Sequence, residues 1–464
     1  MIVIGSRFTK AAALGSALSL AVACGGSSED DPKPKGDSAV GGNDASGGFA
    51  ASGGFAASGG NTGGSATGGT GAIDAGDGTI EISKSNLSGA ETETNLAVAA
   101  DGRMLAVWIG VLTAGGSTNG YAFSLDEGKT WTPPMSLPAP GGRVASDPVA
   151  FAAPNGRMYM TFIAFQRDAQ GQPFDMRAYL SESAPGSTTL EAPIDLTGPV
   201  ASDSIDKPWG IVTPDGKIYV TWLDTGQPRM RVAIVDPSTK AVNIVNIDSG
   251  QGFRNLIYPC HDAVTGRLYV VYHPGGGIGL RGSDDGGLTW PLTTAVALQS
   301  DLSPIFDDPT CAAHDGKVWV SYGIGTDNFD PSENPRSDHL RIARSDNGGQ
   351  TFSHIFAEDT TAGSKFLHPQ LTRTANGDLH LLYYAGTNQD PDPQGTVRLA
   401  TSTDGGNSFA PSRVVRKPIR FTKARSNQLW LGDYIGVTAK GPAVYGVFAD
   451  NTSGASHVRF FAGQ

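Results

Sequence analysis

The sequence predicts an all-β protein, a seven-bladed β-propeller with four antiparallel strands in each blade. One hairpin pattern recurs seven times from residue 101 onward, and one turn motif recurs four times between the hairpins. In addition, no stretch has apolar residues at convincing helical spacing. A six-bladed propeller, in which one hairpin only decorates the ring, is the alternative fold.

Each hairpin combines a glycine turn, a strand of alternating apolar residues and an aromatic residue that follows the glycine. Glycine supplies the positive φ that a tight turn needs, and alternation with a period of two is typical of a strand. The copies are DGRMLAVW (101–108), NGRMYMTF (155–162), DGKIYVTW (215–222), TGRLYVVY (265–272), DGKVWVSY (315–322), NGDLHLLY (376–383) and KGPAVYGVF (440–448). One more strand precedes each turn and two follow the hairpin, which gives four strands per blade.

The two ends of the repeated region predict how the ring closes. The segment HVRFFA (457–462) has the pattern of a third strand that lacks a fourth, and TIEISKS (79–85) precedes the first hairpin without a partner. Pairing these two segments would complete the last blade and leave no open sheet edge. We therefore expect the N-terminal strand to lie beside the C-terminal strand.

The turn motif lies between the third and fourth strands of four blades. Its copies are SLDEGKTW (124–131), SDDGGLTW (283–290), SDNGGQTF (345–352) and STDGGNSF (402–409). The acidic side chain can accept backbone N–H groups across the turn, glycine adopts a conformation that other residues avoid, and the aromatic ring packs beside it. These are structural roles, so the chemistry must be sought elsewhere in the chain.

This turn motif resembles the Asp box, or bacterial neuraminidase repeat, of the sialidase-like propellers, and the resemblance covers the chain from about Thr79 to its end. In that family the boxes lie on the blade periphery, away from the catalytic site, and they also occur in proteins that are not sialidases. The resemblance implies a glycoside hydrolase of the exo-sialidase type. However, the Arg-Ile-Pro of sialidases is not found here, and the three arginines that clamp a substrate carboxylate cannot be assigned.

Polar residues at the starts of the first strands supply other candidates, since these positions line the central channel of a propeller. The candidate catalytic residues are Asp206, Asp308, His368 and Asp433, and the candidate ligand-binding residues are Asp147, Lys207, Trp209, His261, Trp430 and Tyr434. The segments DKPWG (206–210) and WLGDYIG (430–436) place acids beside aromatic rings, a combination suited to sugar binding. The structural alternative is that Asp before Pro begins a strand and that the tryptophans belong to the core.

Two kinds of chemistry fit these candidates. A pair of carboxyl groups can divide the acid and base roles of glycoside hydrolysis. Alternatively, Asp and His side chains can hold a divalent cation such as Ca²⁺, although the sequence assigns no metal ligand.

The N-terminus predicts export and lipidation. Residues 1–23 have basic residues followed by a short apolar run, which is typical of a signal peptide, and they end in Ala-Val-Ala before Cys24. This sequence resembles a bacterial lipoprotein processing site, so Cys24 is the expected lipidated residue, with plain secretion as the alternative. Residues 24–78 are rich in Gly, Ala and Ser and predict a disordered tether with a reach of about 40 Å. The propeller then spans 79–464, and the expected location is the cell envelope, at the outer membrane or cell surface.

Composition narrows the expected partners. A formal net charge of -11 leaves no basic field for a phosphate backbone, so nucleic acid is not expected. We expect a monomer that meets the membrane only through its lipid. Besides Cys24, the chain has Cys260 and Cys311, which either form a disulfide or are two small buried residues.

Together these observations predict a sialidase-like propeller that binds or acts on an extracellular carbohydrate at its central channel. Its activity would be that of a glycoside hydrolase. The alternatives are a non-catalytic module that binds a glycan or other ligand, and an envelope scaffold, because the fold alone does not decide activity.

Overall fold

The computed structural model describes residues 77–83, 89–111, 116–198, 204–224, 229–248, 255–274, 277–298, 309–325, 333–334, 336–358, 363–424 and 428–463. The predicted signal peptide, Cys24, the tether as far as residue 76 and Asp308 lie outside these residues. Within the described ranges, no helix has the length and apolar character that crossing a membrane requires.

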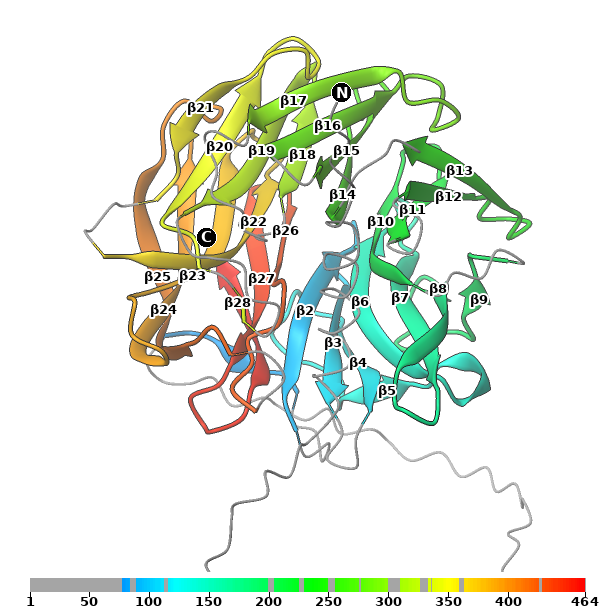
Figure 1. Cartoon of the computed structure of the whole chain (residues 1–464), viewed down its shortest axis with the longest axis horizontal. Coiled ribbons are helices and arrows are strands. Elements are labelled where there is room, and N and C mark those ends of the chain that lie inside the picture. The colour runs from blue at the N-terminus through cyan, green and yellow to red at the C-terminus, as the bar shows by residue number, and fades with distance from the viewer. Residues whose placement is uncertain are drawn as a thin grey trace, which may run out of the picture.

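The described strands form seven antiparallel sheets of four strands each, and each sheet is one blade of a β-propeller (Figure 1). The seven-bladed prediction is therefore confirmed, and the six-bladed alternative is wrong. A short 3-10 helix, η1 (Pro140–Gly142), lies between the strands of the first two blades.

The bounds of the strands follow the repeat in the sequence. The first three blades contain β2 (Glu91–Val98), β3 (Met104–Val111), β4 (Ser117–Ser124) and β5 (Met135–Leu137); β6 (Val144–Ala152), β7 (Met158–Arg167), β8 (Pro173–Ser183) and β9 (Ile194–Asp195); and β10 (Ile205–Val212), β11 (Ile218–Asp224), β12 (Arg229–Val235) and β13 (Val242–Asp248). The next three contain β14 (Asn255–His261), β15 (Leu268–His273), β16 (Gly277–Ser283) and β17 (Leu292–Leu298); β18 (Thr310–His314), β19 (Lys317–Ile324), β20 (His339–Ser345) and β21 (Ser353–Phe356); and β22 (Lys365–Arg373), β23 (Leu379–Gly386), β24 (Asp392–Ser402) and β25 (Ala410–Phe421). The last blade contains β26 (Gly436–Lys440), β27 (Ala443–Asp450), β28 (His457–Gly463) and β1 (Ile80–Glu81).

The first strand of each blade lies innermost, and the core lies between neighbouring blades. The strands β2, β6, β10, β14, β18, β22 and β26 follow one another around the middle of the molecule. Leu105 and Val107 of β3 pack against Met160 and Phe162 of β7, and all four side chains are fully buried. Each such side chain contributes about 1.5–3 kcal/mol to folding.

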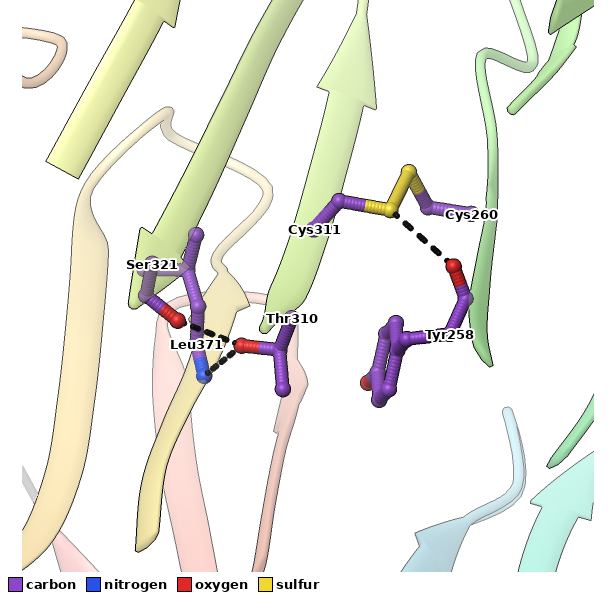
Figure 2. The surroundings of a disulfide bond; sticks show 6 residues. All are labelled: Tyr258, Cys260, Thr310, Cys311, Ser321 and Leu371. Carbon is purple, nitrogen blue, oxygen red and sulfur yellow. Dashed lines mark hydrogen bonds between the residues drawn. A yellow bond between two sulfur atoms is a disulfide. The ribbon is translucent and has the colours of Figure 1, made fainter. Parts of the chain in front are cut away.

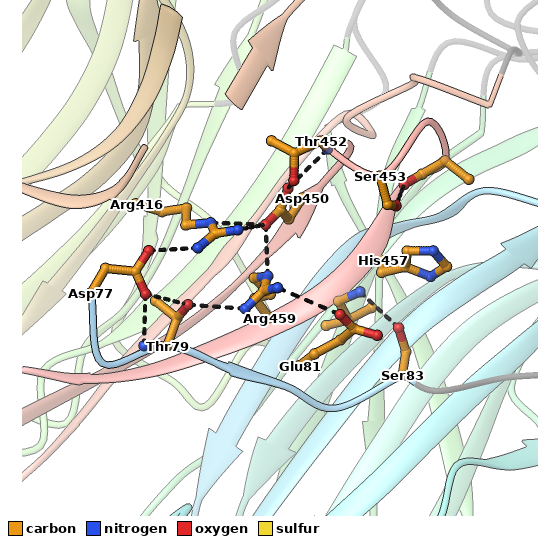
Figure 3. Close-up of polar contacts among 12 residues, drawn as sticks. Asp77, Thr79, Glu81, Ser83, Arg416, Asp450, Thr452, Ser453, His457 and Arg459 are labelled. Atoms are coloured by element: carbon orange, nitrogen blue, oxygen red, sulfur yellow. Dashed lines mark hydrogen bonds and ion pairs between the residues drawn. The ribbon is translucent and has the colours of Figure 1, made fainter. Parts of the chain in front are cut away.

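The ring closes as the sequence predicts. In the last blade β1 pairs antiparallel with β28, with Ile80 opposite Phe460 and Glu81 opposite Arg459. Ion pairs reinforce this short strand (Figure 3), because Asp77 lies 2.7 Å from Arg416 and Glu81 lies 3.5 Å from Arg459.

Asp450 connects the two arginines of this closure. Its carboxylate lies 2.9 Å from Arg416 and 2.6 Å from Arg459. A partly buried chain of alternating charges therefore runs from the segment before β1, through β25 and the end of β27, to β28. The first and last strands of the propeller, β1 and β28, are thus held together in the last blade.

The Ser side chain and the Asp or Asn side chain of the turn motif form closely similar hydrogen bonds in all four copies, and the two copies that end in Trp add one more. In the second copy, Ser283 Oγ donates to Asp285 Oδ1 at 2.9 Å and accepts from the N–H of Gly287 at 2.9 Å. Asp285 also accepts from the backbone and the side chain of Thr289, at 2.9 and 2.6 Å. Trp290 completes the turn by donating to the carbonyl oxygen of Gly287 at 3.1 Å.

The turn motif also packs each blade that carries it against the preceding blade. Tyr219 of β11 donates to the carbonyl oxygen of Gly286, and a Cβ atom on Gly287 would lie 3.2 Å from the Tyr219 ring. In the first copy a Cβ on Gly128 would lie only 2.2 Å from Phe460 of β28. Glycine is thus needed for its positive φ and for close contact with an aromatic ring of the neighbouring blade.

A disulfide between Cys260 and Cys311 connects the first strands of two neighbouring blades, β14 and β18 (Figure 2). The two Cα atoms lie 5.9 Å apart, within the usual range for a disulfide. Beside it, Thr310 Oγ1 contacts Ser321 Oγ at 2.6 Å and accepts from the N–H of Leu371 in β22 at 3.0 Å. Of the two readings that the sequence left open, the disulfide is the one that forms.

Candidate functional site

β-bulges interrupt five of the seven first strands close to where each strand begins. The register shifts fall between Thr92 and Asn95, Ser146 and Val149, Asp206 and Trp209, Asn255 and Tyr258, and Leu367 and Gln370. A bulge re-aims a side chain, and bulges are frequent beside functional sites. They therefore mark a region in which five blades depart from regular pairing at the same level of the ring.

Four of these bulges hold a polar residue at positive φ. The φ angles are 50° at Glu93, 52° at Asp147, 50° at Lys207 and 56° at His368, and all four residues are buried. A non-glycine residue in this conformation costs about 1–3 kcal/mol and persists only where its surroundings hold it there. Four different side chains thus occupy equivalent positions in four blades.

The topology gives the ring two distinct ends. Each first strand begins near its bulge and runs to its hairpin turn, and the turn motif joins the third strand to the fourth at the same end as the hairpins. We call these the bulge end and the turn end. The candidate residues discussed below lie at the bulge end, unless stated otherwise.

Lys207 lies at the centre of a group of carboxyl groups, which we call the Lys207 cluster: Glu93, Asp147, Asp206, Lys207 and Asp433. The ammonium nitrogen of Lys207 lies 2.8 Å from Asp433 Oδ2 and 3.5 Å from Glu93 Oε1. Its backbone N–H donates to Asp206 Oδ1 at 2.9 Å and to Asp147 Oδ2 at 3.4 Å. Three first strands and the segment before β26 therefore meet at one lysine.

Burial controls the protonation of this cluster. It raises the pKa values of the Glu93 and Asp206 carboxyls well above their usual range, against the opposing attraction of Lys207. Burial lowers the pKa of Lys207, but the four carboxyl groups outweigh it and raise that pKa well above its usual range. The cluster therefore favours the ammonium form of Lys207 and the protonated forms of the Glu93 and Asp206 carboxyls.

Contacts between carboxyl groups raise the same two pKa values further. Asp147 has side-chain hydrogen bonds with both Glu93 and Asp206. Ionised carboxylates only accept hydrogen bonds, so each of these contacts requires a proton on one partner. Asp433 has the most exposed carboxylate among the ion-paired members, with 14% of its side chain accessible against 2% for Glu93.

Aromatic side chains fill the ring beside this cluster. The Trp209 ring centroid lies 4.7 Å from that of Tyr258 and 5.3 Å from that of Tyr434, and Tyr434 donates to the carbonyl oxygen of Pro148. Lys207 Nζ lies 5.3 Å from the centroid of the Tyr434 ring. Trp209 and Tyr434 are 4% and 1% exposed, so these rings have little surface left on which a sugar could stack.

His368 reaches the same region through Asn334. The side-chain amide of Asn334 donates to the carbonyl oxygen of Gly432 at 2.7 Å and lies 3.4 Å from His368 Nε2. Gly432 has a φ of 90°, and a Cβ atom there would lie 2.5 Å from the backbone nitrogen of Glu93. Glycine at this position therefore lets the segment that carries Asp433 approach β2 closely.

Other predicted residues lie elsewhere. We expected His261 at the start of a first strand, and this was wrong: it is the last residue of β14, opposite Leu268, at the turn end. The reason is that β14 begins at Asn255, so its bulge comes before His261. Trp430 is buried, and its carbonyl oxygen accepts a hydrogen bond from Ser456 at 2.5 Å, next to the start of β28.

Sequence reasoning missed Glu93, Asn334 and Tyr258. The residues that it found at the bulges, Asp147, Lys207 and His368, all precede a proline, whereas Glu93 precedes Thr94. A search for Xaa-Pro at the start of each first strand could therefore find three of the four bulge residues.

The cluster does not have the arrangement of a metal site. Among the described residues, no group of three or more His, Cys, Asp or Glu side chains could hold a metal ion. Lys207 occupies the position between carboxyl groups in which a cation would otherwise balance their charge.

No protein-family model and no curated protein matches this sequence. Among solved structures, the fold is similar to a Hadza microbial sialidase, with a TM-score of 0.51 and 15% identity over 83% of this chain and 68% of that protein. It is also similar to an ulvan lyase, a polysaccharide lyase bound to -[GlcA(1-4)Rha3S]-, with a TM-score of 0.55 and 11% identity over 82% of this chain and 95% of that protein. At these identities the similarity establishes a sialidase-like β-propeller fold.

Proposed function

We propose that this protein is an exported, lipid-anchored propeller that acts on an extracellular carbohydrate at its bulge end. One observation carries the assignment of the site. Asp433 forms an ion pair with Lys207 at 2.8 Å in a buried cluster in which burial raises the pKa values of the Glu93 and Asp206 carboxyls. Groups whose pKa values are displaced by burial and by a specific charge partner are typical of catalytic and binding sites.

The arrangement supplies both halves of acid–base chemistry. Hydrolysis of a glycoside needs one protonated carboxyl group and one ionised carboxylate. Asp433, with the more exposed carboxylate, is the residue that we assign to contact the sugar. Asp206, whose pKa is raised by burial, is the group that we assign to donate the proton, and Glu93 is a positioning residue that contacts Lys207 directly at 3.5 Å.

A non-catalytic binding module is the second candidate, and one observation favours it. Asp206 and Glu93 are 7% and 2% exposed, so their protons have little direct access to a glycosidic oxygen. In this alternative, Asp433 and Lys207 bind a sugar hydroxyl and no bond is broken.

Hydrolysis of a panel of fluorogenic glycosides that includes a sialoside separates these functions. We expect Asp433→Asn to lower kcat/KM by about 100-fold or more, because it removes the carboxylate that contacts the sugar. The control is Asp285→Asn in the turn motif, since Asn347 occupies the same position in the third copy and makes the same contacts to Ser345 and Thr351.

The outcomes of this panel are distinct. Absence of turnover together with glycan binding that Asp433→Asn abolishes would establish the binding module. Neither turnover nor binding of any glycan would contradict a carbohydrate function at this site.

Export and lipidation belong to the same proposal. The Cys260–Cys311 disulfide supports export, because disulfides persist in oxidising compartments. Metabolic labelling with a radioactive fatty acid tests lipidation. We expect label on the wild-type chain and none on Cys24→Ala, and an unlabelled wild-type chain in the culture medium would indicate plain secretion.

A further inference from the structure

The connection between β19 and β20 of the fifth blade contacts the bulge end of the sixth blade. Its described part, which we call the strap, comprises residues 333–334 and 336–338. Ser337 pairs with Phe366 of β22, and each N–H donates to the carbonyl oxygen of the other residue at 2.9 Å. The backbone N–H of Asn334 donates to the carbonyl oxygen of Lys423 at 2.8 Å, just beyond the end of β25. The strap thus reaches from the fifth blade to the connection between the sixth blade and the last.

Arg336 fastens the middle of the strap. Its guanidinium group donates to the backbone carbonyl oxygens of residues 387, 388 and 389, at 3.1, 3.1 and 2.9 Å. The same group lies 5.4 Å from the centroid of the Phe421 ring. Because Arg336 is buried and makes all these contacts, it holds the neighbouring Asn334 in a defined place.

The contacts of Asn334 bear on where His368 carries its proton. The carbonyl oxygen of Gly432 can only accept, so the atom that lies 2.7 Å from it is the amide nitrogen of Asn334. The same nitrogen lies 3.4 Å from His368 Nε2, which as its partner must accept a hydrogen bond. A ring nitrogen that accepts carries no proton, so this contact favours the neutral His368 ring with its proton on Nδ1.

The same amide group holds the backbone that carries Asp433. Asp433 follows Gly432 directly, so the hydrogen bond from Asn334 restrains the peptide group that joins these two residues. One side chain from the fifth blade therefore contacts both His368 of the sixth blade and the segment before the last blade.

We propose that Asn334 is a positioning residue of the carbohydrate site, which sets the tautomer of His368 and the place of Asp433 together. This inference rests on the proposed function, because Asp433 is the residue that we assign to contact the sugar. Asn334 is 4% exposed and acts through its two neighbours rather than on the sugar. Displacement of a reacting group by about 1 Å can lower a rate about 100-fold, so loss of the amide group should lower kcat more than it raises KM.

Asn334→Asp tests the tautomer, because it replaces the donating nitrogen with an acceptor of nearly the same shape. Nitrogen-15 NMR of the histidine rings in the full chain distinguishes the two tautomers, and the signals absent from His368→Gln identify those of His368. We expect the proton on Nδ1 in the wild type and on Nε2 in Asn334→Asp, since the new carboxylate accepts from Nε2–H. Asn334→Ala removes the amide group without adding a charge, and we expect it to give a mixture of the two tautomers.

Hydrolysis by the same samples tests the effect on the site. We expect Asn334→Asp to lower kcat by about tenfold or more and to change KM by less than about threefold. The matched control is Asn347→Asp in the turn motif, which makes the same chemical change at a position where the other copies have Asp126, Asp285 and Asp404. This control should change neither kcat nor the signals of His368.

The results separate this inference from the proposed function. A wild-type His368 with its proton on Nε2, or an Asn334→Asp protein in which the proton stays on Nδ1, would overturn the inference. A loss of kcat in Asn347→Asp as large as that in Asn334→Asp would overturn it as well. Absence of turnover in the wild type would contradict the proposed hydrolase, and the tautomers in the same samples would still decide whether Asn334 positions His368.

Discussion

The turn motif and the Lys207 cluster use the same residue types in opposite ways. Asp285 lies in an exposed turn where hydrogen bonds from Thr289 and Ser283 lower its pKa to about 2. Asp206 lies in the ring interior, where burial raises its pKa well above the usual range. The supply of donors and solvent therefore decides whether an aspartate stabilises the fold as an anion or retains a proton.

The turn motif and the bulge positions also differ in how much their residues vary from blade to blade. The acceptor of the turn motif is Asp126, Asp285, Asn347 or Asp404, so the side chain changes little from copy to copy. The bulge positions hold Glu93, Asp147, Lys207 and His368, which differ in charge and size. In a repeat protein, uniform positions indicate architecture, and equivalent positions with dissimilar polar residues indicate a site.

Between the Lys207 cluster and the turn motif, we expect the largest loss of stability from Lys207→Met in the cluster. This substitution leaves several buried carboxyl groups without their cation, and we expect the free energy of unfolding to fall by about 3–5 kcal/mol. Urea unfolding followed by tryptophan fluorescence measures it. The matched control is Lys217→Met, which removes an exposed pair to Asp215 and should change stability by less than about 1 kcal/mol. Equal effects of the two substitutions would contradict the central role of Lys207.

A smaller effect is expected in the turn motif from Ser283→Ala. The buried hydroxyl group of Ser283 donates to Asp285 and accepts from Gly287, so its loss leaves a buried N–H without an acceptor. We expect a loss of about 1–3 kcal/mol in the free energy of unfolding. Glycan binding should be retained, because the turn end is remote from the Lys207 cluster. Loss of binding in a folded Ser283→Ala protein would show that the two ends are coupled.

The smallest effect is a change in the pH dependence of stability, and its sign should differ between the two regions. The lowered pKa of Asp285 stabilises the fold above about pH 4, and this contribution is lost as the pH falls toward 2. The raised pKa of Asp206 means that the native state binds the extra proton, so stability falls as the pH rises above about 4.

Unfolding free energies measured from pH 3 to 8 test these signs. We expect Asp206→Asn to flatten the decline in stability on the alkaline side, and Asp285→Asn to flatten the loss on the acidic side. A change of the same sign in both variants would contradict the assignment of a retained proton to Asp206.

The fold could be predicted from the sequence because its signals are periodic. Seven glycine hairpins define the blades, and the unpaired segments at 79–85 and 457–462 define the closure between β1 and β28. The disulfide could not be decided, since the distance between Cys260 and Cys311 depends on how β14 and β18 lie side by side.

The candidate site was predicted only in part because it is assembled across blades. Proline-adjacent residues led to Asp147, Lys207 and His368, but no local pattern marks Glu93 or Asn334. His261 was predicted at the start of β14 but lies at its end, next to the hairpin turn. The bulge of β14 lies near the start of the strand, between Asn255 and Tyr258. The sequence of the WLGDYIG segment (430–436) also did not reveal that the Tyr434 side chain is buried in the packed interior of the ring.

The short strand β1 has a mechanical consequence. It begins at the turn end, so the polypeptide upstream of Asp77 enters the ring at the end opposite to the Lys207 cluster. Any force transmitted along that upstream chain acts on the seam of the ring, where β1 pairs with β28 through two residues and Glu81 forms an ion pair with Arg459. Asp77, just before β1, forms an ion pair with Arg416. A force applied through the upstream chain therefore acts first on the pairing of β1 with β28. The bulge end, which carries the Lys207 cluster, lies on the opposite side of the ring from this force.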